Sequence, residues 1–243
     1  MVRVLCLLAL VAGVCVAPAA QATTIVLDFE DVTNGQILTS SQGVGISATR
    51  RTAAGNEAGL AVIFDTANTA NSDADLQAAP FNAGVGAVGV TAPLGRHSQV
   101  LIIQNSDQNP CGTSCATPND NARGGVLSFD FTALAREGVT LRAVDLLEFR
   151  SDYTLTLDLA DGSEMVLSGA GFGIGDDRSG TLDFATYLGG TAPSGVVGLT
   201  MTATASAAID TLTFDVAAVP LPQSLAALAL ALTGLALVRH RGV

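Results

Sequence analysis

The sequence has no lysine and no tryptophan, and its 243 residues include only two histidines and two tyrosines. Its 11 basic residues, all arginine, stand against 22 acidic residues, so the formal net charge is −11. This shortage of cations argues against a nucleic-acid partner, because phosphates have to be neutralised by basic side chains, and against adsorption to anionic lipid headgroups. The shortage of aromatic residues removes the flat surface on which sugar rings usually stack, although Asn, Asp and Arg side chains can still bind a sugar.

Cysteine is also scarce, with four in the chain. Cys6 and Cys15 fall in an apolar N-terminal run, so Cys111 and Cys115 are the two left in the middle of the sequence. In an oxidising exterior these two are expected to close a short disulfide loop. Three residues separate them, which does not fit a redox Cys-x-x-Cys motif. A zinc site would need two more ligands, and His97 is the only histidine before the C-terminal tail.

The N-terminus has the three parts of a secretory signal peptide. Arg3 precedes an apolar run, Val4–Val16, and the small residues Ala20 and Ala22 provide a cleavage site. We therefore expect residues 1–22 to form a signal helix that signal peptidase removes.

The last 25 residues also divide into three parts: the stretch VPLPQS from Val219, an apolar run Leu225–Val238, and the basic tail Arg239-His240-Arg241. As a helix, residues 219–238 would be about 30 Å long, which matches the hydrocarbon thickness of a bilayer. A transmembrane helix over about 221–238 is expected, with the arginines kept in the cytoplasm. The prolines keep the backbone before the helix extended and open to a processing enzyme; the alternative is that they only start the helix.

This tail resembles the VPLPA-type variant of the PEP-CTERM sorting signals of exported bacterial proteins. Val219, Pro220, Leu221 and Pro222 match the motif, and Gln223 stands where the family usually has alanine. The resemblance implies processing by an exosortase-type enzyme, a precursor anchored in the inner membrane, and a final location at the cell surface or outside the cell. Fragments such as Asp28-Phe29-Glu30 and Ser128-Phe129-Asp130-Phe131 look like those of β-sandwich ectodomains in other exosortase-sorted proteins.

Between the terminal segments lies one domain, residues 23–218, with a net charge near −14 from eight arginines and 22 acidic residues. Apolar residues recur there with a period of two in short runs separated by Gly, Asn, Asp and Ser, as in half-buried strands. No long amphipathic helix competes, so we predict an all-β, antiparallel β-sandwich of jelly-roll type. The expected strands are Ile25–Val32, Gly45–Arg50, Leu60–Thr66, Val100–Asn105, Val126–Thr132, Val139–Arg150, Tyr153–Ala160, Ser163–Ser168, Gly195–Ala203 and Ile209–Val216.

The same alternation predicts a hairpin and a core. Asp161-Gly162 is expected to supply the positive φ angles of a tight primed turn between two strands. The glycine-rich stretches Gly84–Gly95 and Gly169–Gly180 are expected to be loops. The predicted core consists of Val26, Phe29, Ile46, Val62, Phe64, Leu101, Ile103, Phe129, Phe131, Leu146, Phe149, Leu157, Leu199, Leu212 and Phe214.

Carboxylates near the two ends of the domain form a candidate site for structural calcium. Calcium takes six to eight oxygen ligands, and its extracellular concentration fills weak sites that join loops. If the first and last strands meet, Asp28 or Glu30 would face Asp210 or Asp215. The alternative is that these four are outward-facing strand carboxylates.

The chain lacks the signals of common hydrolases. A serine triad would depend on His97, and the Gly-x-Ser-x-Gly motif does not occur. A glycosidase needs two carboxylates at a fixed separation, and nothing in the sequence selects a pair; the group Asp65, Asp73 and Asp75 is expected in a solvated loop. We therefore expect a non-catalytic, exported structural or binding module associated with exopolysaccharide, with a carbohydrate-active hydrolase as the alternative.

Overall fold

The computed structural model describes residues 21–71, 73, 76–77, 82–83, 87–92, 98–107, 110–175 and 178–217. The expected transmembrane helix and sorting tail, and nearly all of the expected signal peptide, lie outside these residues. Within the described ranges no helix has the length and apolar character needed to cross a membrane. The domain described below is the compact unit Thr24–Val216.

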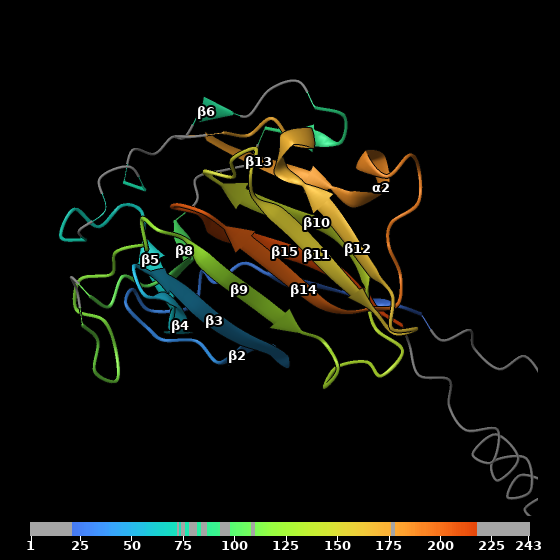
Figure 1. Cartoon of the computed structure of the whole chain (residues 1–243). Helices are drawn as coiled ribbons and strands as arrows, with labels where there is room; N and C mark the ends of the chain where they lie inside the picture. Colours follow the sequence, from blue (N-terminus) through green and yellow to red (C-terminus); the bar gives the residue numbers. More distant parts are fainter. Residues whose placement is uncertain are drawn as a thin grey trace, which may run out of the picture. The chain divides into compact units, whose positions relative to one another are not determined.

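Two β-sheets form this domain, as the sequence predicts (Figure 1). Their long pairings are antiparallel, and the two-residue pairing of β6 with β13 is parallel. The first sheet has the order β5 (Ala61–Asp65), β8 (Gln99–Ile103), β15 (Ala208–Val216), β10 (Thr140–Leu147), β13 (Arg178–Asp183) and β6 (Asn82–Ala83), with β1 (Thr23–Leu27) beside β15 and β7 (Val90–Thr91) beside β13. The second has the order β12 (Glu164–Ser168), β11 (Thr154–Leu159), β14 (Val196–Ala203), β9 (Gly125–Asp130), β3 (Val44–Thr52) and β2 (Ser40–Ser41), with β4 (Gly55–Gly59) beside β3.

The main hydrophobic core lies between the sheets. Phe129 of β9 and Leu199 of β14 pack in one cluster with Leu212 and Phe214 of β15, and all four are at most 2% exposed. Burying a side chain of this size stabilises the fold by about 1.5–3 kcal/mol relative to leaving it in water. The alternation of inward apolar and outward polar residues on these strands therefore produces the sandwich.

A second, smaller core covers the outer face of β5 and β8. Val62 and Phe64 of β5 and Val100 and Ile102 of β8 belong to it, and Cys115 packs against them from the long segment between β8 and β9. These two strands are consequently buried on both faces, which explains their continuous apolar sequences.

The predicted core is confirmed except at Val26, which is 45% exposed. β1 ends at Leu27, which is fully buried, and the chain then turns at Phe29 with φ 59°. Because side chains alternate along a strand, burying Leu27 points Val26 to the other face.

The ten predicted strands are all present, with ends that move by up to five residues. The prediction that Gly169–Gly180 is a loop is wrong, since it contains the short 3-10 helix η1 (Gly169–Gly171) and the first half of β13. Close packing explains the glycine at position 180, because a Cβ there would lie 3.0 Å from Cγ1 of Val90 in β7. The short strands β2, β4, β6 and β7 were also not predicted.

The β11–β12 hairpin exists, but its turn differs from the prediction. Only Gly162 has a positive φ, 83°. The Gly162 N–H donates to the carbonyl of Leu159 at 2.9 Å, and the Asp161 carboxylate accepts from the N–H of Ser163 at 2.9 Å. This is a three-residue loop with glycine in the left-handed position, rather than a two-residue primed turn.

Candidate functional site

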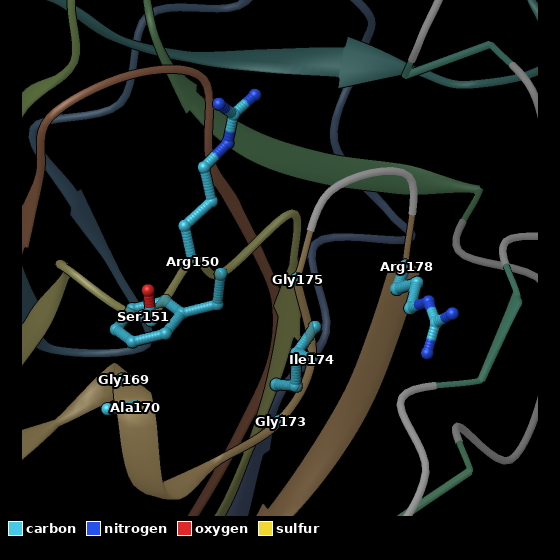
Figure 2. Close-up of a pocket in the computed structure, with 9 residues that line it drawn as sticks. Arg150, Ser151, Gly169, Ala170, Gly173, Ile174, Gly175 and Arg178 are labelled. Carbon is cyan, nitrogen blue, oxygen red and sulfur yellow. The ribbon is translucent and has the colours of Figure 1, made fainter.

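An open pocket of about 440 Å³ lies at the end of β10. The chain leaves β10 through Glu148, which has φ 56° and whose N–H donates to the carbonyl of Arg178 at 2.7 Å. The pocket is formed by the segment after β10, by η1 with the loop that follows it, and by the start of β13. Its lining residues are Phe149, Arg150, Ser151, Gly169, Ala170, Gly173, Ile174, Gly175 and Arg178 (Figure 2).

Glycine allows these segments to approach closely. A Cβ on Gly169 would lie 2.1 Å from the carbonyl oxygen of Arg150 and 2.9 Å from Cε1 of Phe149. On the other side of the pocket, the N–H of Gly175 donates to the carbonyl of Phe149 at 3.0 Å. The Phe149 ring also packs against Tyr153 and Phe172, each with a centroid distance of 5.3 Å. The base of the pocket is therefore fixed by packing and main-chain hydrogen bonds.

The polar groups of the pocket are mainly hydrogen-bond donors. Figure 2 shows Arg150 and Arg178 on opposite sides of it, with side chains that point in different directions. Arg178 and Ser151 are exposed, and Arg150 is half-buried. Two separated guanidinium groups suit separate acceptors on an extended ligand better than a single bidentate anion. The arrangement can bind oxygen-rich groups, and none of the lining residues that the structure describes is a carboxylate or a histidine.

A second feature of the interior is a pair of buried carboxyl groups. Asp73, in the segment after β5, and Asp120, in the segment before β9, are only 4% and 5% exposed. The N–H of Asp120 donates to Oδ2 of Asp73 at 3.2 Å. The hydroxyl of Ser206, in the turn between β14 and β15, donates to Oδ2 of Asp120.

Burial is the main cause that raises the pKa of Asp120 well above its ordinary value, because it removes water from the charged form. A hydrogen bond with the Asp73 carboxyl and the negative charges of Asp73 and Glu148 raise the pKa further, and only the bond from Ser206 opposes them. The uncharged form of Asp120 is therefore favoured beside the Asp73 carboxyl. The pair does not line the pocket, so it gives the hydrolase alternative no support.

The prediction that Asp73 lies in a solvated loop is wrong, and the importance of Asp120 was missed. No signal in the sequence could have found this pair, because the two residues are 47 positions apart in segments without periodicity. The pocket was missed for a related reason: its residues come from three segments that the sequence presents as separate loops.

The structure does not assemble the predicted calcium site from Asp28, Glu30, Asp210 and Asp215. Among the residues that the structure describes, no three His, Cys, Asp or Glu side chains are grouped to hold a metal ion. Asp28 accepts from the N–H of Glu30 at 3.4 Å, Glu30 accepts from the N–H of Gln99 at 3.4 Å, and Asp210 is buried within β15.

Asp215 of that set has other partners. Its Oδ1 accepts from the hydroxyl of Thr24 at 2.7 Å and its Oδ2 from Nε of Arg142 at 2.6 Å. The bond from Thr24, followed by those from Arg142, holds the pKa of Asp215 below its ordinary value. An arginine thus occupies the position in which a cation was expected to balance this carboxylate.

Cys111 and Cys115 form a disulfide, with their Cα atoms 4.5 Å apart. The N–H of Cys115 donates to the carbonyl of Gly35 at 2.8 Å. A Cβ on Gly35 would lie 2.0 Å from the carbonyl oxygen of Cys115, so glycine is required at this contact. The disulfide loop is therefore fastened to the segment before β2.

No protein-family model matches this chain, and no curated protein is detectably similar to it in sequence. Among solved structures, the chain is similar to a DUF4465 family protein from Bacteroides ovatus, with 11% sequence identity and a TM-score of 0.31. That similarity covers 81% of this chain and 100% of the other.

Proposed function

We propose that this protein is an exported, non-catalytic module of the cell surface or extracellular matrix, and that the pocket between Arg150 and Arg178 binds exopolysaccharide. The observation that carries the proposal is the set of donors in this pocket. Guanidinium and hydroxyl donors bind sugar hydroxyls and carboxylates, whereas a catalytic site for glycoside hydrolysis needs two carboxyl groups facing its substrate.

The ends of the chain and the disulfide support the proposed location. A leader, a VPLP stretch, an apolar run and an arginine tail together favour export, anchoring in the inner membrane and processing by an exosortase-type enzyme. The Cys111–Cys115 disulfide is suited to an oxidising exterior. For the domain we propose a jelly-roll topology, in which loops at the end of the sandwich present the pocket.

Two features distinguish this pocket from common sugar-binding sites and indicate the class of its ligand. The pocket's aromatic side chain, Phe149, is fully buried, so recognition would rely on hydrogen bonds rather than on ring stacking. The charged side chains among its described lining residues, Arg150 and Arg178, are positive although the domain as a whole is strongly acidic. At physiological salt these local charges dominate over distant ones, because screening acts beyond about 8 Å. A polysaccharide that carries carboxylate groups is therefore the expected ligand class.

Binding can be tested with a glycan array that contains acidic and neutral polysaccharides, probed with the full-length protein. We expect retention on acidic glycans, and a loss of about tenfold in affinity for Arg178→Ala, which corresponds to about 1.4 kcal/mol. The matched control is Arg136→Ala, which removes the same charge from an exposed turn outside the pocket. Equal effects of the two variants would show that binding, if seen, does not use this pocket.

Localisation tests the other half of the proposal. The intact protein is expected in the envelope or matrix fraction, and a chain that lacks residues 219–243 is expected in the medium or periplasm. Attachment that persists without the tail would refute the anchoring step and leave the pocket untouched.

A further inference from the structure

The Asp73–Asp120 pair joins three parts of the chain that are far apart in sequence. Asp73 belongs to the segment after β5, Asp120 to the segment between β8 and β9, and Ser206 to the β14–β15 turn. All three side chains are at least 94% buried. Asp120 contacts both of the others: its N–H donates to the Asp73 carboxylate, and its own carboxyl group accepts from the Ser206 hydroxyl.

Each of these segments is in turn attached to the sandwich. Asn121, next to Asp120, donates its N–H to the carbonyl of Ile103 at 2.8 Å and its side-chain amide to the carbonyl of Arg51 at 2.9 Å. The carbonyl of Ser206 accepts from the hydroxyl of Tyr153 at 2.7 Å. Through Asn121 and Ser206, Asp120 is therefore connected by hydrogen bonds to β8, to the end of β3 and to Tyr153, which precedes β11.

We propose that the Asp73–Asp120 pair is a proton-dependent latch: one shared proton ties the three segments together, and loss of that proton makes the two carboxylates repel each other and loosens the segments. Two carboxyl groups within hydrogen-bonding reach cannot both be ionised at low cost away from water.

The groups around Asp120 do little to stabilise its negative charge after the proton is lost. Among the residues that the structure describes, the charged groups that raise its pKa are acidic, Asp73 and Glu148. Ser206 and Gln104, which also lie against Asp120, are neutral. Ser206 can donate one hydrogen bond, but it cannot neutralise a second negative charge.

The sign of the effect follows from proton linkage. The folded protein holds a proton on Asp120 at pH values where the unfolded chain, with the ordinary carboxyl pKa of 3.8, has lost it. The stability that the latch contributes is present below that value and is lost as pH rises through the raised pKa of the folded state. Across this window the unfolding equilibrium constant rises about tenfold per pH unit for one proton.

The test compares melting temperatures of the full-length protein between about pH 4 and pH 9 for the natural sequence and for Asp120→Asn. The introduced amide donates to Asp73 and accepts from Ser206 without any titration. We expect the natural protein to lose stability as pH rises, and the variant to change less and to become the more stable of the two at alkaline pH. The control is Asp31→Asn, an exposed carboxylate in the turn after β1, which should leave the slope unchanged.

A second measurement applies even if Asp120→Asn does not fold. Hydrogen-exchange protection factors of residues 119–124 and 204–207 in the natural protein should fall at alkaline pH, while those of β9 and β14 stay high. Protection that is independent of pH in these segments, or identical pH slopes for the natural protein and Asp120→Asn, would overturn the latch.

Discussion

At the scale of single residues, Gly169 determines how closely η1 approaches the segment after β10. The space that its missing Cβ leaves is occupied by the carbonyl oxygen of Arg150 and the ring of Phe149. A backbone atom cannot move aside as a flexible side chain can, so the pocket wall depends on this glycine.

Gly169→Ala is therefore expected to destabilise the protein by about 2 kcal/mol, as overpacking of a tight contact usually does. The measurement is the midpoint of urea unfolding. Gly112→Ala is the matched control, because a Cβ there has nothing within 4 Å, and its effect should stay within about 0.5 kcal/mol. Similar midpoints for both variants would show that η1 can move away from Arg150.

Residue-level burial was predictable where it follows from alternation along one strand. Phe129, Leu199 and Phe214 are buried for that reason. Asp73 and Asp120 are buried for a different reason, since separate segments fold over them. Burial of this kind depends on the tertiary arrangement and leaves no trace in a local pattern.

At the scale of elements, the disulfide loop stabilises one side of the domain. The ring that Cys111 and Cys115 close is short, and the chain-entropy estimate for a loop of this length is about 2 kcal/mol. Cys115 also fills part of the smaller core over β5 and β8. The conformation of the disulfide loop and the packing of β5 and β8 therefore stabilise each other.

Replacing both cysteines by serine is expected to lower the free energy of unfolding by about 2 kcal/mol. The same loss should appear in the natural protein under a reductant, and a reductant should not affect the double variant further. Denaturant midpoints measured for the four combinations would check this. A reductant effect that persists in the double variant would assign the loss to something other than the Cys111–Cys115 bond.

Strand prediction succeeded for elements that carry their own alternating pattern and failed for those defined by a partner. β4 is rich in polar and small residues and pairs with β3, and β7 is two residues long and pairs with β13. β13 contains Gly180. A glycine in this sequence predicts a loop, whereas in the structure it allows close packing against Val90. Register in these strands is set by neighbours that the sequence does not identify.

At the scale of the whole molecule, the acidic residues act on stability in two opposite directions. Asp130 and Asp161 accept hydrogen bonds from Thr132 and Ser163, which lower their pKa values, and the helix-capping Asp183 is affected in the same way by the N–H of Thr186. Each such group contributes stability above the unfolded pKa of 3.8, and this is lost as pH falls through its folded value.

The stability of the protein is therefore expected to fall on both sides of a mildly acidic maximum. As pH falls below the unfolded pKa of 3.8, the stability from the carboxylates with lowered pKa values is lost progressively through their folded values. As pH rises above 3.8, the stability from the latch declines until the raised pKa of Asp120 is passed. Urea midpoints measured across the pH range would show the maximum. Asp183→Asn should make the decline on the acid side shallower and leave the slope on the alkaline side unchanged, and midpoints that keep rising down to about pH 2 would contradict the expectation.

The partners of individual carboxylates explain why the structure does not group the four predicted calcium ligands. The sequence shows carboxylates near both ends of the domain, but not that Arg142 on β10 reaches Asp215. In a domain with few cations, the positions of individual arginines decide which acidic groups are left for other partners. These positions depend on which strands are neighbours.

The β11–β12 hairpin forms one border of its sheet, where Val166 is 60% exposed. Such a border is a template for the strand of another molecule, particularly in a crowded matrix. Asp158 and Glu164 lie directly opposite each other in this hairpin and place two negative charges at its tip. Their mutual repulsion weakens the hairpin slightly. The same charges disfavour pairing of this edge with a second copy of the protein and so oppose the growth of fibres.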